Sequence, residues 1–106
     1  MLFLHVAVPS AVQDLTLSVT EDFLMIHWDS SVGVVSHYVV IIRISGKELQ
    51  FSVTGYNFCL QTDNLSGYAT VEVIVRAVNE AGIGPSATVT DELKQMQEQS
   101  KYTVMT

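Results

Sequence analysis

The sequence predicts an all-β fold, a seven-stranded antiparallel β-sandwich. Short stretches in which apolar and polar residues alternate, typical of half-buried strands, recur between residues 15 and 90. Residues that favour turns separate these stretches at close and regular spacing, as in sandwiches and barrels. The length of 106 residues and the 48% of hydrophobic residues suit one domain with a modest core.

The first two strands are predicted at residues 15–19 and 23–28. In the second of them Leu24, Ile26 and Trp28 fall on one face, because side chains two positions apart on a strand point the same way. Trp28 is the only tryptophan, and burying it would remove about 150–250 Å² of surface from water. We therefore expect Trp28 at the centre of the core.

The middle strands follow from a dense run of β-branched residues and a hairpin. Residues 37–44 form that run and predict the third strand. Ser45 and Gly46 can then turn the chain into residues 49–53 as a hairpin. A short fifth strand is predicted at residues 58–61.

The last two strands are predicted at residues 70–79 and 86–90, and we expect Gly82, Gly84 and Pro85 to break the chain between them. The predicted domain organisation follows from these limits. It comprises a linker or N-terminal edge segment at residues 1–8, the sandwich domain at residues 9–90, and a polar linker or tail at residues 91–106.

Charge and cysteine content exclude several function classes. The formal net charge is −6, and the five lysines and arginines are scattered, whereas nucleic acids and anionic membranes require clustered positive charge. No apolar run approaches the roughly 20 residues of a membrane-spanning helix. Cys59 is the only cysteine, so it cannot form an internal disulfide, and cysteine usage leaves the compartment open.

Between Pro9 and Thr90 the order of residues resembles a fibronectin type III domain. The resemblance rests on Leu24 to Trp28, on the spacing to Tyr38, on Leu65, and above all on residues 71–86, VEVIVRAVNEAGIGPS. It implies an immunoglobulin-like sandwich, and we expect these side chains in its core: Trp28, Tyr38, Leu65, Val73 and Val75. Val71 stands where the family usually has a tyrosine, so the hydrogen bond of that tyrosine at the preceding corner is lost.

The same resemblance implies a non-catalytic function. We expect a protein–protein interaction module of a larger extracellular adhesion, matrix or receptor protein, with an extracellular or cell-surface location favoured. The alternative is a structural spacer domain in an intracellular, muscle-type scaffold protein. In either setting the expected contacts are with protein partners and with neighbouring domains of a longer chain.

The candidate reactive residues form no recognisable catalytic or metal-binding pattern. Cys59 lies in a predicted strand with no histidine placed beside it, and free cysteines are often buried and inert. His27 and Asp29 share a strand face, but zinc usually takes three or four ligands, and the sequence does not place His37 near them. We therefore expect no enzyme activity, no metal and no cofactor.

Two surfaces are candidates for binding a partner. An apolar stripe flanked by two arginines is predicted on the outer face of the third and sixth strands, although β-branched pairs there can simply stabilise the sheet. Apolar loop residues at one end of the sandwich either contact a partner or tuck into the core. The stripe comprises Val39, Ile41, Ile74 and Val78, and the loop residues are Val32, Val34 and Ile83.

Asn64 begins an N-glycosylation sequon, Asn64-Leu65-Ser66. It is predicted at a corner turn, at the opposite end of the sandwich from the apolar loops. A glycan there would place the domain in the secretory pathway without blocking those loops.

Overall fold

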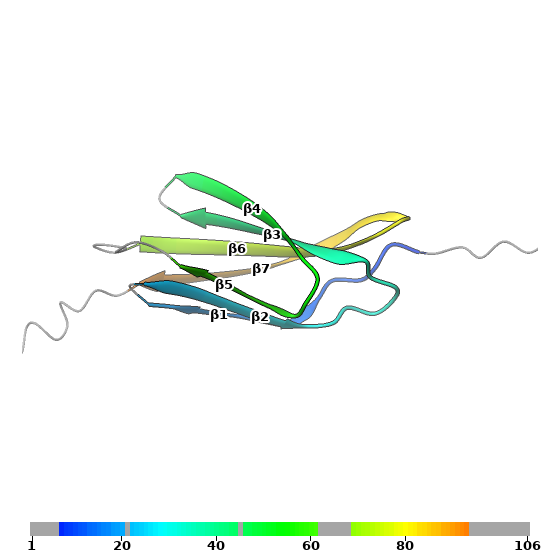
Figure 1. The fold of residues 1–106 in the computed structure, drawn as a ribbon, viewed down its shortest axis with the longest axis horizontal. Helices are drawn as coiled ribbons and strands as arrows, with labels where there is room; N and C mark the ends of the chain where they lie inside the picture. The colour runs from blue at the N-terminus through cyan, green and yellow to red at the C-terminus, as the bar shows by residue number, and fades with distance from the viewer. Residues whose placement is uncertain (1–6, 21, 45, 62–68, 94–106) are drawn as a thin grey trace, which may run out of the picture.

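The computed structural model describes residues 7–20, 22–44, 46–61 and 69–93. Within these ranges the chain forms seven strands in two antiparallel sheets, with no helix (Figure 1). The all-β sandwich predicted from the sequence is confirmed.

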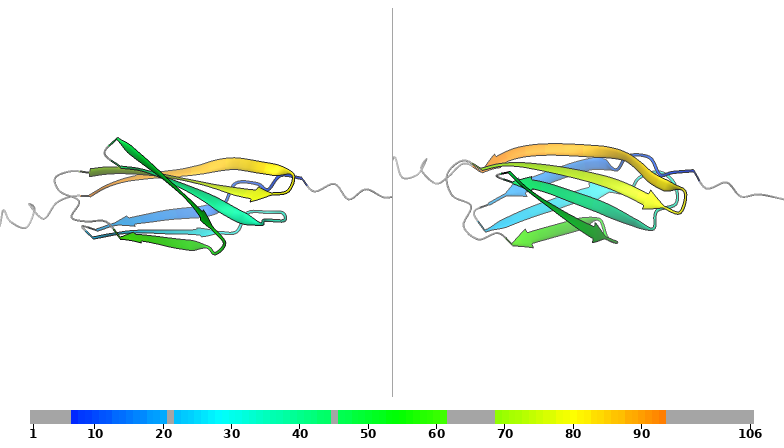
Figure 2. Two further views of the ribbon diagram at one scale, coloured as in Figure 1. Left: turned by 45° about the horizontal axis from the view of Figure 1, so that its top comes forward. Right: turned by 90° about the horizontal axis from the view of Figure 1, so that it is seen from above.

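The two sheets stack as layers, and the apolar faces of their strands meet between them (Figures 1 and 2). The smaller sheet has the order β1-β2-β5 and the larger one the order β4-β3-β6-β7. The strands are β1 (Gln13–Val19), β2 (Phe23–Asp29), β3 (His37–Ile44), β4 (Lys47–Val53), β5 (Asn57–Gln61), β6 (Ala69–Asn79) and β7 (Gly82–Leu93).

The core contains the residues that the alternation of the sequence places inward. The side chains of Trp28 and Tyr38 are 0% and 2% exposed, and their rings meet edge to face with centroids 5.4 Å apart. Val73 and Val75 are fully buried with them. Leu65, the fifth expected core residue, lies outside the described residues.

Burial changes the acidity of the core residue Tyr38. Taking the phenol of Tyr38 out of water disfavours its ionised form, and the neighbouring phenol of Tyr56 adds to the effect. Together they raise the pKa of Tyr38 above its ordinary value of 10.0. Tyr38 is therefore a neutral core residue at physiological pH.

Strand β7 is longer than the sequence predicts, and the prediction of residues 86–90 is wrong at both ends. Gly82 does not break the chain, because a two-residue turn at Glu80 and Ala81 returns it directly to pair Gly82 with Asn79. Gly82 adopts a φ of +144°, which glycine tolerates at no steric cost. The other end of β7 continues to Leu93, opposite the start of β6.

Pro85 also lies within β7 rather than in a break before it. Gly84 and Pro85 together oppose the single residue Ala77 of β6, so the strand contains a β-bulge. A bulge on an edge strand is a position where a proline, which has no N–H to donate, fits into a sheet. The sequence pattern around Gly84 and Pro85 predicts the end of a strand, because it contains no information about the partner strand that accommodates them.

Candidate interaction surfaces

One end of the sandwich is built from three segments that are distant in sequence. These are the N-terminal segment (residues 7–12), the β2–β3 loop (residues 30–36) and the β6–β7 turn (Figure 1). Asn79, whose side chain is 6% exposed, ties all three together. Its Nδ2 donates hydrogen bonds to the carbonyl oxygens of Ala7 at 2.8 Å and Val34 at 2.9 Å, and its Oδ1 accepts one from the Ala81 N–H at 2.8 Å.

Further backbone contacts fix the β2–β3 loop against the N-terminal segment. The Ser10 N–H donates to the Val32 carbonyl at 3.1 Å, and the Val32 N–H donates to the Ser10 hydroxyl at 2.9 Å. The Ser36 N–H donates to the Val78 carbonyl at 2.8 Å. The loop is therefore held at both of its ends.

The N-terminal segment also packs closely on the bulge of β7. A Cβ atom built on Gly84 would overlap the carbonyl oxygen of Pro9, and Gly84 is buried. Only glycine therefore allows the backbone of Pro9 to lie at this distance. This close approach keeps the N-terminal segment beside the β6–β7 hairpin.

Four apolar side chains project from this framework and form what we call the loop-end patch: Val8, Val32, Val34 and Ile83. Their exposed fractions are 45%, 74%, 66% and 57%. The three loop residues identified from the sequence thus point away from the core rather than into it. Val8 was not identified from the sequence, because residues 1–8 were interpreted as a linker or N-terminal edge segment, although Pro9 directly after it favours an extended backbone at Val8.

The residues of the outer-face stripe lie side by side on the larger sheet, but much of their apolar surface is covered by neighbouring side chains. Ile41 pairs directly with Ile74, Val39 with Arg76, and Val78 with His37. Ile74 is only 9% exposed, and Val39, Ile41 and Val78 are half-buried. The stripe therefore exposes much less apolar side chain than the loop-end patch does.

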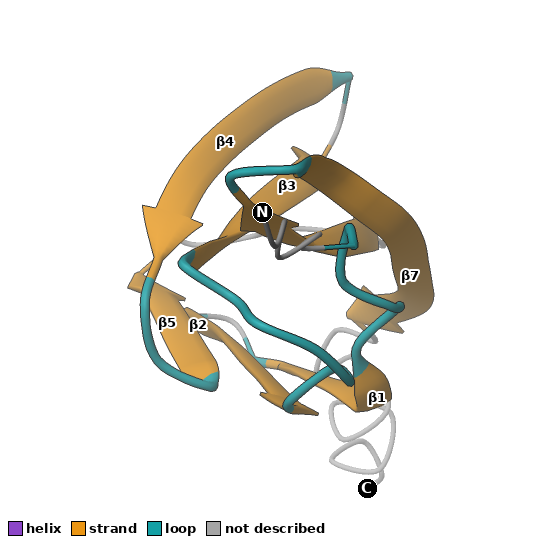
Figure 3. Ribbon diagram, turned by 90° about the vertical axis from the view of Figure 1, so that its right-hand side faces the viewer, coloured by secondary structure: helices purple, strands orange, loops and turns teal. Residues whose placement is uncertain are grey.

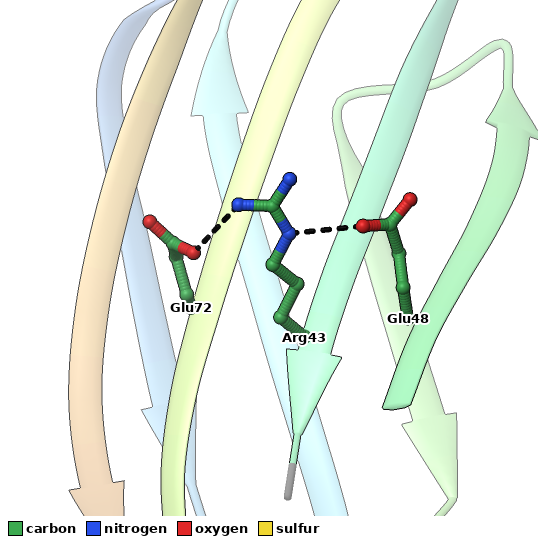
Figure 4. A network of polar contacts seen from close by, with 3 residues as sticks. All are labelled: Arg43, Glu48 and Glu72. Carbon is green, nitrogen blue, oxygen red and sulfur yellow. Dashed lines mark hydrogen bonds and ion pairs between the residues drawn. The ribbon is translucent and has the colours of Figure 1, made fainter. Parts of the chain in front are cut away.

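Ion pairs neutralise one of the two arginines on this face. Arg43 donates from Nε to Glu48 at 3.0 Å and from Nη1 to Glu72 at 3.1 Å (Figure 4). Its hydrogen bonds with Glu48 and Glu72 raise the pKa of Arg43 further above its already high value. The Nε of Arg76, in contrast, is buried and has no hydrogen-bond partner within the part of the chain that the structure describes.

The candidate metal ligands do not converge. His27 and Asp29 approach to 3.8 Å, and both side chains are exposed. The ring of His37 instead forms a hydrogen bond with the Ser36 hydroxyl at 3.0 Å. Within the described ranges no three histidine, cysteine, aspartate or glutamate side chains lie close enough to hold a metal ion.

Cys59 is exposed on β5, whereas free cysteines are often buried. It lines a shallow groove of about 630 Å³ on the outer face of the smaller sheet, together with Met25, His27 and Asn57. Met25 lies directly opposite Cys59 in the ladder, and His27 opposite Asn57.

The described residues contain no helix with the length and apolarity needed to cross a bilayer.

Residues 10–93 match the fibronectin type III domain family. The chain belongs to this family. None of the curated protein sequences matches the chain significantly. Solved structures of fibronectin type III domains resemble it closely in fold, so the suspected resemblance is confirmed.

Three solved structures illustrate the range of proteins that contain a similar fold. The fibronectin type III domain of human collagen XX is 25% identical, with a TM-score of 0.63 over 77% of this chain and 91% of that one. Domains d3–d4 of the rat CD45 extracellular region are 17% identical, with a TM-score of 0.69 over 82% of this chain, which spans 51% of that chain. Domains A168–A170 of titin are 16% identical, with a TM-score of 0.63 over 84% of this chain and 32% of that one.

Proposed function

We propose that this fibronectin type III domain is a non-catalytic protein-interaction module of a larger protein and that the loop-end patch is its contact surface. The observation that carries the proposal is the exposure of four apolar side chains on loops fixed by the buried Asn79. Contiguous exposed apolar surface commonly marks an interface. A surface that is already ordered loses less conformational entropy on binding than a flexible one.

The charge around the patch narrows the kind of partner. The N-terminal segment, the β2–β3 loop and the β6–β7 turn contain no lysine or arginine. Asp29 directly precedes the β2–β3 loop, and Glu80 lies in the β6–β7 turn. An apolar partner surface rimmed by basic side chains would complement this end of the domain. The outer-face stripe is the weaker candidate because Ile74 is already buried.

The alternative function is a spacer in an intracellular scaffold. In that case the loop-end patch would be covered by the domain that precedes it in the same polypeptide, because the N-terminal segment enters at this end (Figure 1). The two functions therefore differ in whether the covering surface belongs to another protein or to the same one.

A photo-reactive benzoylphenylalanine placed at Val34 in the complete native protein, in cells, separates these possibilities. We expect a cross-linked product heavier than the protein itself. The Val32→Ser and Ile83→Ser changes together should lower its yield by a factor of about ten or more, since a few central residues usually carry most of the binding energy. The matched probe is the same residue at Thr88, which is exposed on the outer face of β7.

Each other pattern of products contradicts the proposal in a different way. Cross-links confined to the same polypeptide would support the spacer. Products from Thr88 but not from Val34 would assign the interface to the outer-face stripe. An absence of products from both positions would remove the case for a partner at either surface.

For the setting of the domain, we propose the cell surface or the extracellular space. The sequon at Asn64 and the likeness to the CD45 extracellular region and to a collagen domain support it, whereas the likeness to titin supports the intracellular alternative. Asn64 itself lies outside the described residues.

Expression in secreting eukaryotic cells tests this setting. We expect the intact mass to fall on glycosidase treatment, and the fall to disappear in the Asn64→Gln variant. A secreted protein without glycan, or a protein retained in the cell, would favour the intracellular scaffold.

A further inference from the structure

We propose that the chain pairs with a second copy of itself through the free edge of β5, antiparallel and with the two-fold axis at Cys59. The pairing would join two three-stranded sheets into one continuous sheet. It uses a surface different from the loop-end patch and goes beyond the proposed function. Strand addition at a sheet edge is an established mode of protein association.

At this edge the backbone of β5 presents hydrogen-bonding groups that have no partner among the described residues. The Trp28 N–H donates to the Tyr56 carbonyl at 3.0 Å, so the polar groups of Tyr56 point toward β2. Because these groups alternate along a strand, those of Phe58 and Leu60 also point toward β2, and those of the intervening residues point away from it. The N–H and C=O groups of Asn57, Cys59 and Gln61 therefore face outward.

The position of β5 leaves this edge accessible. β5 is the last strand of its sheet, and β4 diverges from it beyond their connecting turn (Figures 1 and 2). Viewed along the sandwich, β5 lies on the outer side of β2 (Figure 3). The side chains of Asn57, Cys59 and Gln61 are exposed.

The other three edge strands carry features that discourage such pairing, and β5 carries none. β1 is irregular at Asp14, where φ is +51° and the register shifts. β4 begins with the charged pair Lys47 and Glu48, and β7 contains the Pro85 bulge. Charges, prolines and bulges on edge strands are the means by which proteins prevent edge-to-edge association. The sequence of β5, NFCLQ, has neither a charge nor a proline.

The sequence of β5 complements itself in this arrangement. A two-fold axis at the central residue places Cys59 opposite Cys59 of the second copy and Asn57 opposite Gln61 of the second copy. The two amides can exchange hydrogen bonds, and directly opposed side chains lie about 4.5–5.5 Å apart at their Cβ atoms. On the inner face, half-buried Phe58 would meet Leu60 of the second copy, so apolar groups meet apolar groups.

Salt should strengthen this association. Each copy has a net charge of −6, so two copies repel one another at low ionic strength. The strand that makes the contact is neutral, and salt screens the general repulsion without weakening hydrogen bonds between amides. Dimer formation is therefore expected to rise with ionic strength.

Thiol cross-linking of the full chain with bismaleimidoethane tests the proposal, because Cys59 is the only cysteine and the linker is short. We expect a covalent dimer whose yield rises with protein concentration and with salt. The Asn57→Lys/Gln61→Lys variant places lysine opposite lysine across the axis and should lower the yield by a factor of about five or more. The Asn57→Lys/Gln61→Glu variant places lysine opposite glutamate and should match or exceed the native yield.

The design separates pairing from chance collisions of thiols. Both variants keep Cys59 and change exposed side chains only, and their thermal unfolding is compared with that of the native chain. Equal yields in the two variants, no dimer at the highest concentration, or a dimer in sedimentation that does not cross-link at Cys59 would each overturn the proposal. Val34→Ser should leave the yield unchanged, which keeps this result independent of the loop-end patch.

Discussion

Replacing Trp28 by alanine is expected to lower the free energy of unfolding by about 3–5 kcal/mol, the usual cost of removing a large buried aromatic side chain. Among the described residues, Trp28 has the largest side chain that is fully buried. Its removal would leave a cavity in contact with Tyr38, whose ring meets it edge to face. Since small domains are stable by only about 5–15 kcal/mol, much of this margin would be lost.

Urea titration followed by circular dichroism measures this loss, and Trp28→Phe is the matched control. Phenylalanine keeps an aromatic ring beside Tyr38, and it removes an indole N–H that has no hydrogen-bond partner among the described residues. We expect Trp28→Phe to cost less than half as much as Trp28→Ala. Equal costs for the two variants would mean that the volume of this side chain does not govern the core.

Replacing Asn79 by alanine is expected to cost about 2–3 kcal/mol, although it removes only a few atoms. The change leaves the carbonyl oxygens of Ala7 and Val34 and the N–H of Ala81 without their present partner. When a buried polar group loses its hydrogen-bond partner, the folded state bears the full free-energy cost of having removed that group from water. This cost is larger than the net stabilisation that the hydrogen bond provided. The start of the N-terminal segment should also separate from the loops, because the Ser10–Val32 hydrogen bonds and the packing of Pro9 on Gly84 lie further along the segment.

Chemical denaturation gives the energy of this change, and hydrogen exchange of residues 7–12 reports the release of the segment. The exposed Gln50→Ala is the control and should be close to neutral. In Asn79→Asp the new carboxylate faces two carbonyl oxygens, which would raise its pKa in the folded state. The Asn79→Asp variant should therefore be relatively more stable at acidic pH than at neutral pH. If Asn79→Ala left the free energy of unfolding unchanged, the hydrogen bonds of Asn79 would not hold the loops.

The strands with clear alternation or a dense run of β-branched residues were predictable from the sequence, whereas neighbouring strands determined the limits of the others. β2, β3 and β6 begin or end within a residue of their predicted limits, because one face of each is buried and fixes the period. The limits of β7 were not predictable, because its glycines and proline are accommodated by a bulge opposite Ala77 that only the paired strand reveals.

The candidate surfaces, too, were predictable from the sequence only in part. The register of the outer-face stripe followed from the strands themselves, whereas the burial of Ile74 depends on the side chains around it. The Asn79 clamp could not be predicted, because its partners Ala7 and Val34 lie 72 and 45 residues away in the sequence. Contacts of this separation depend on how loops meet and leave no periodic pattern.

The Asn79 clamp has a mechanical consequence. The N-terminal segment enters at one end of the sandwich and β7 ends at the other (Figure 1), so tension transmitted through the polypeptide would run along the strands. The hydrogen bonds between β1 and β2 lie across that direction and would resist it together, in shear. The bond from Asn79 to Ala7 precedes β1 in the path of the force and would be loaded first. Under load the domain would therefore release Ala7 first, and with it Val8 of the loop-end patch, before the Ser10–Val32 hydrogen bonds break and while both sheets remain intact.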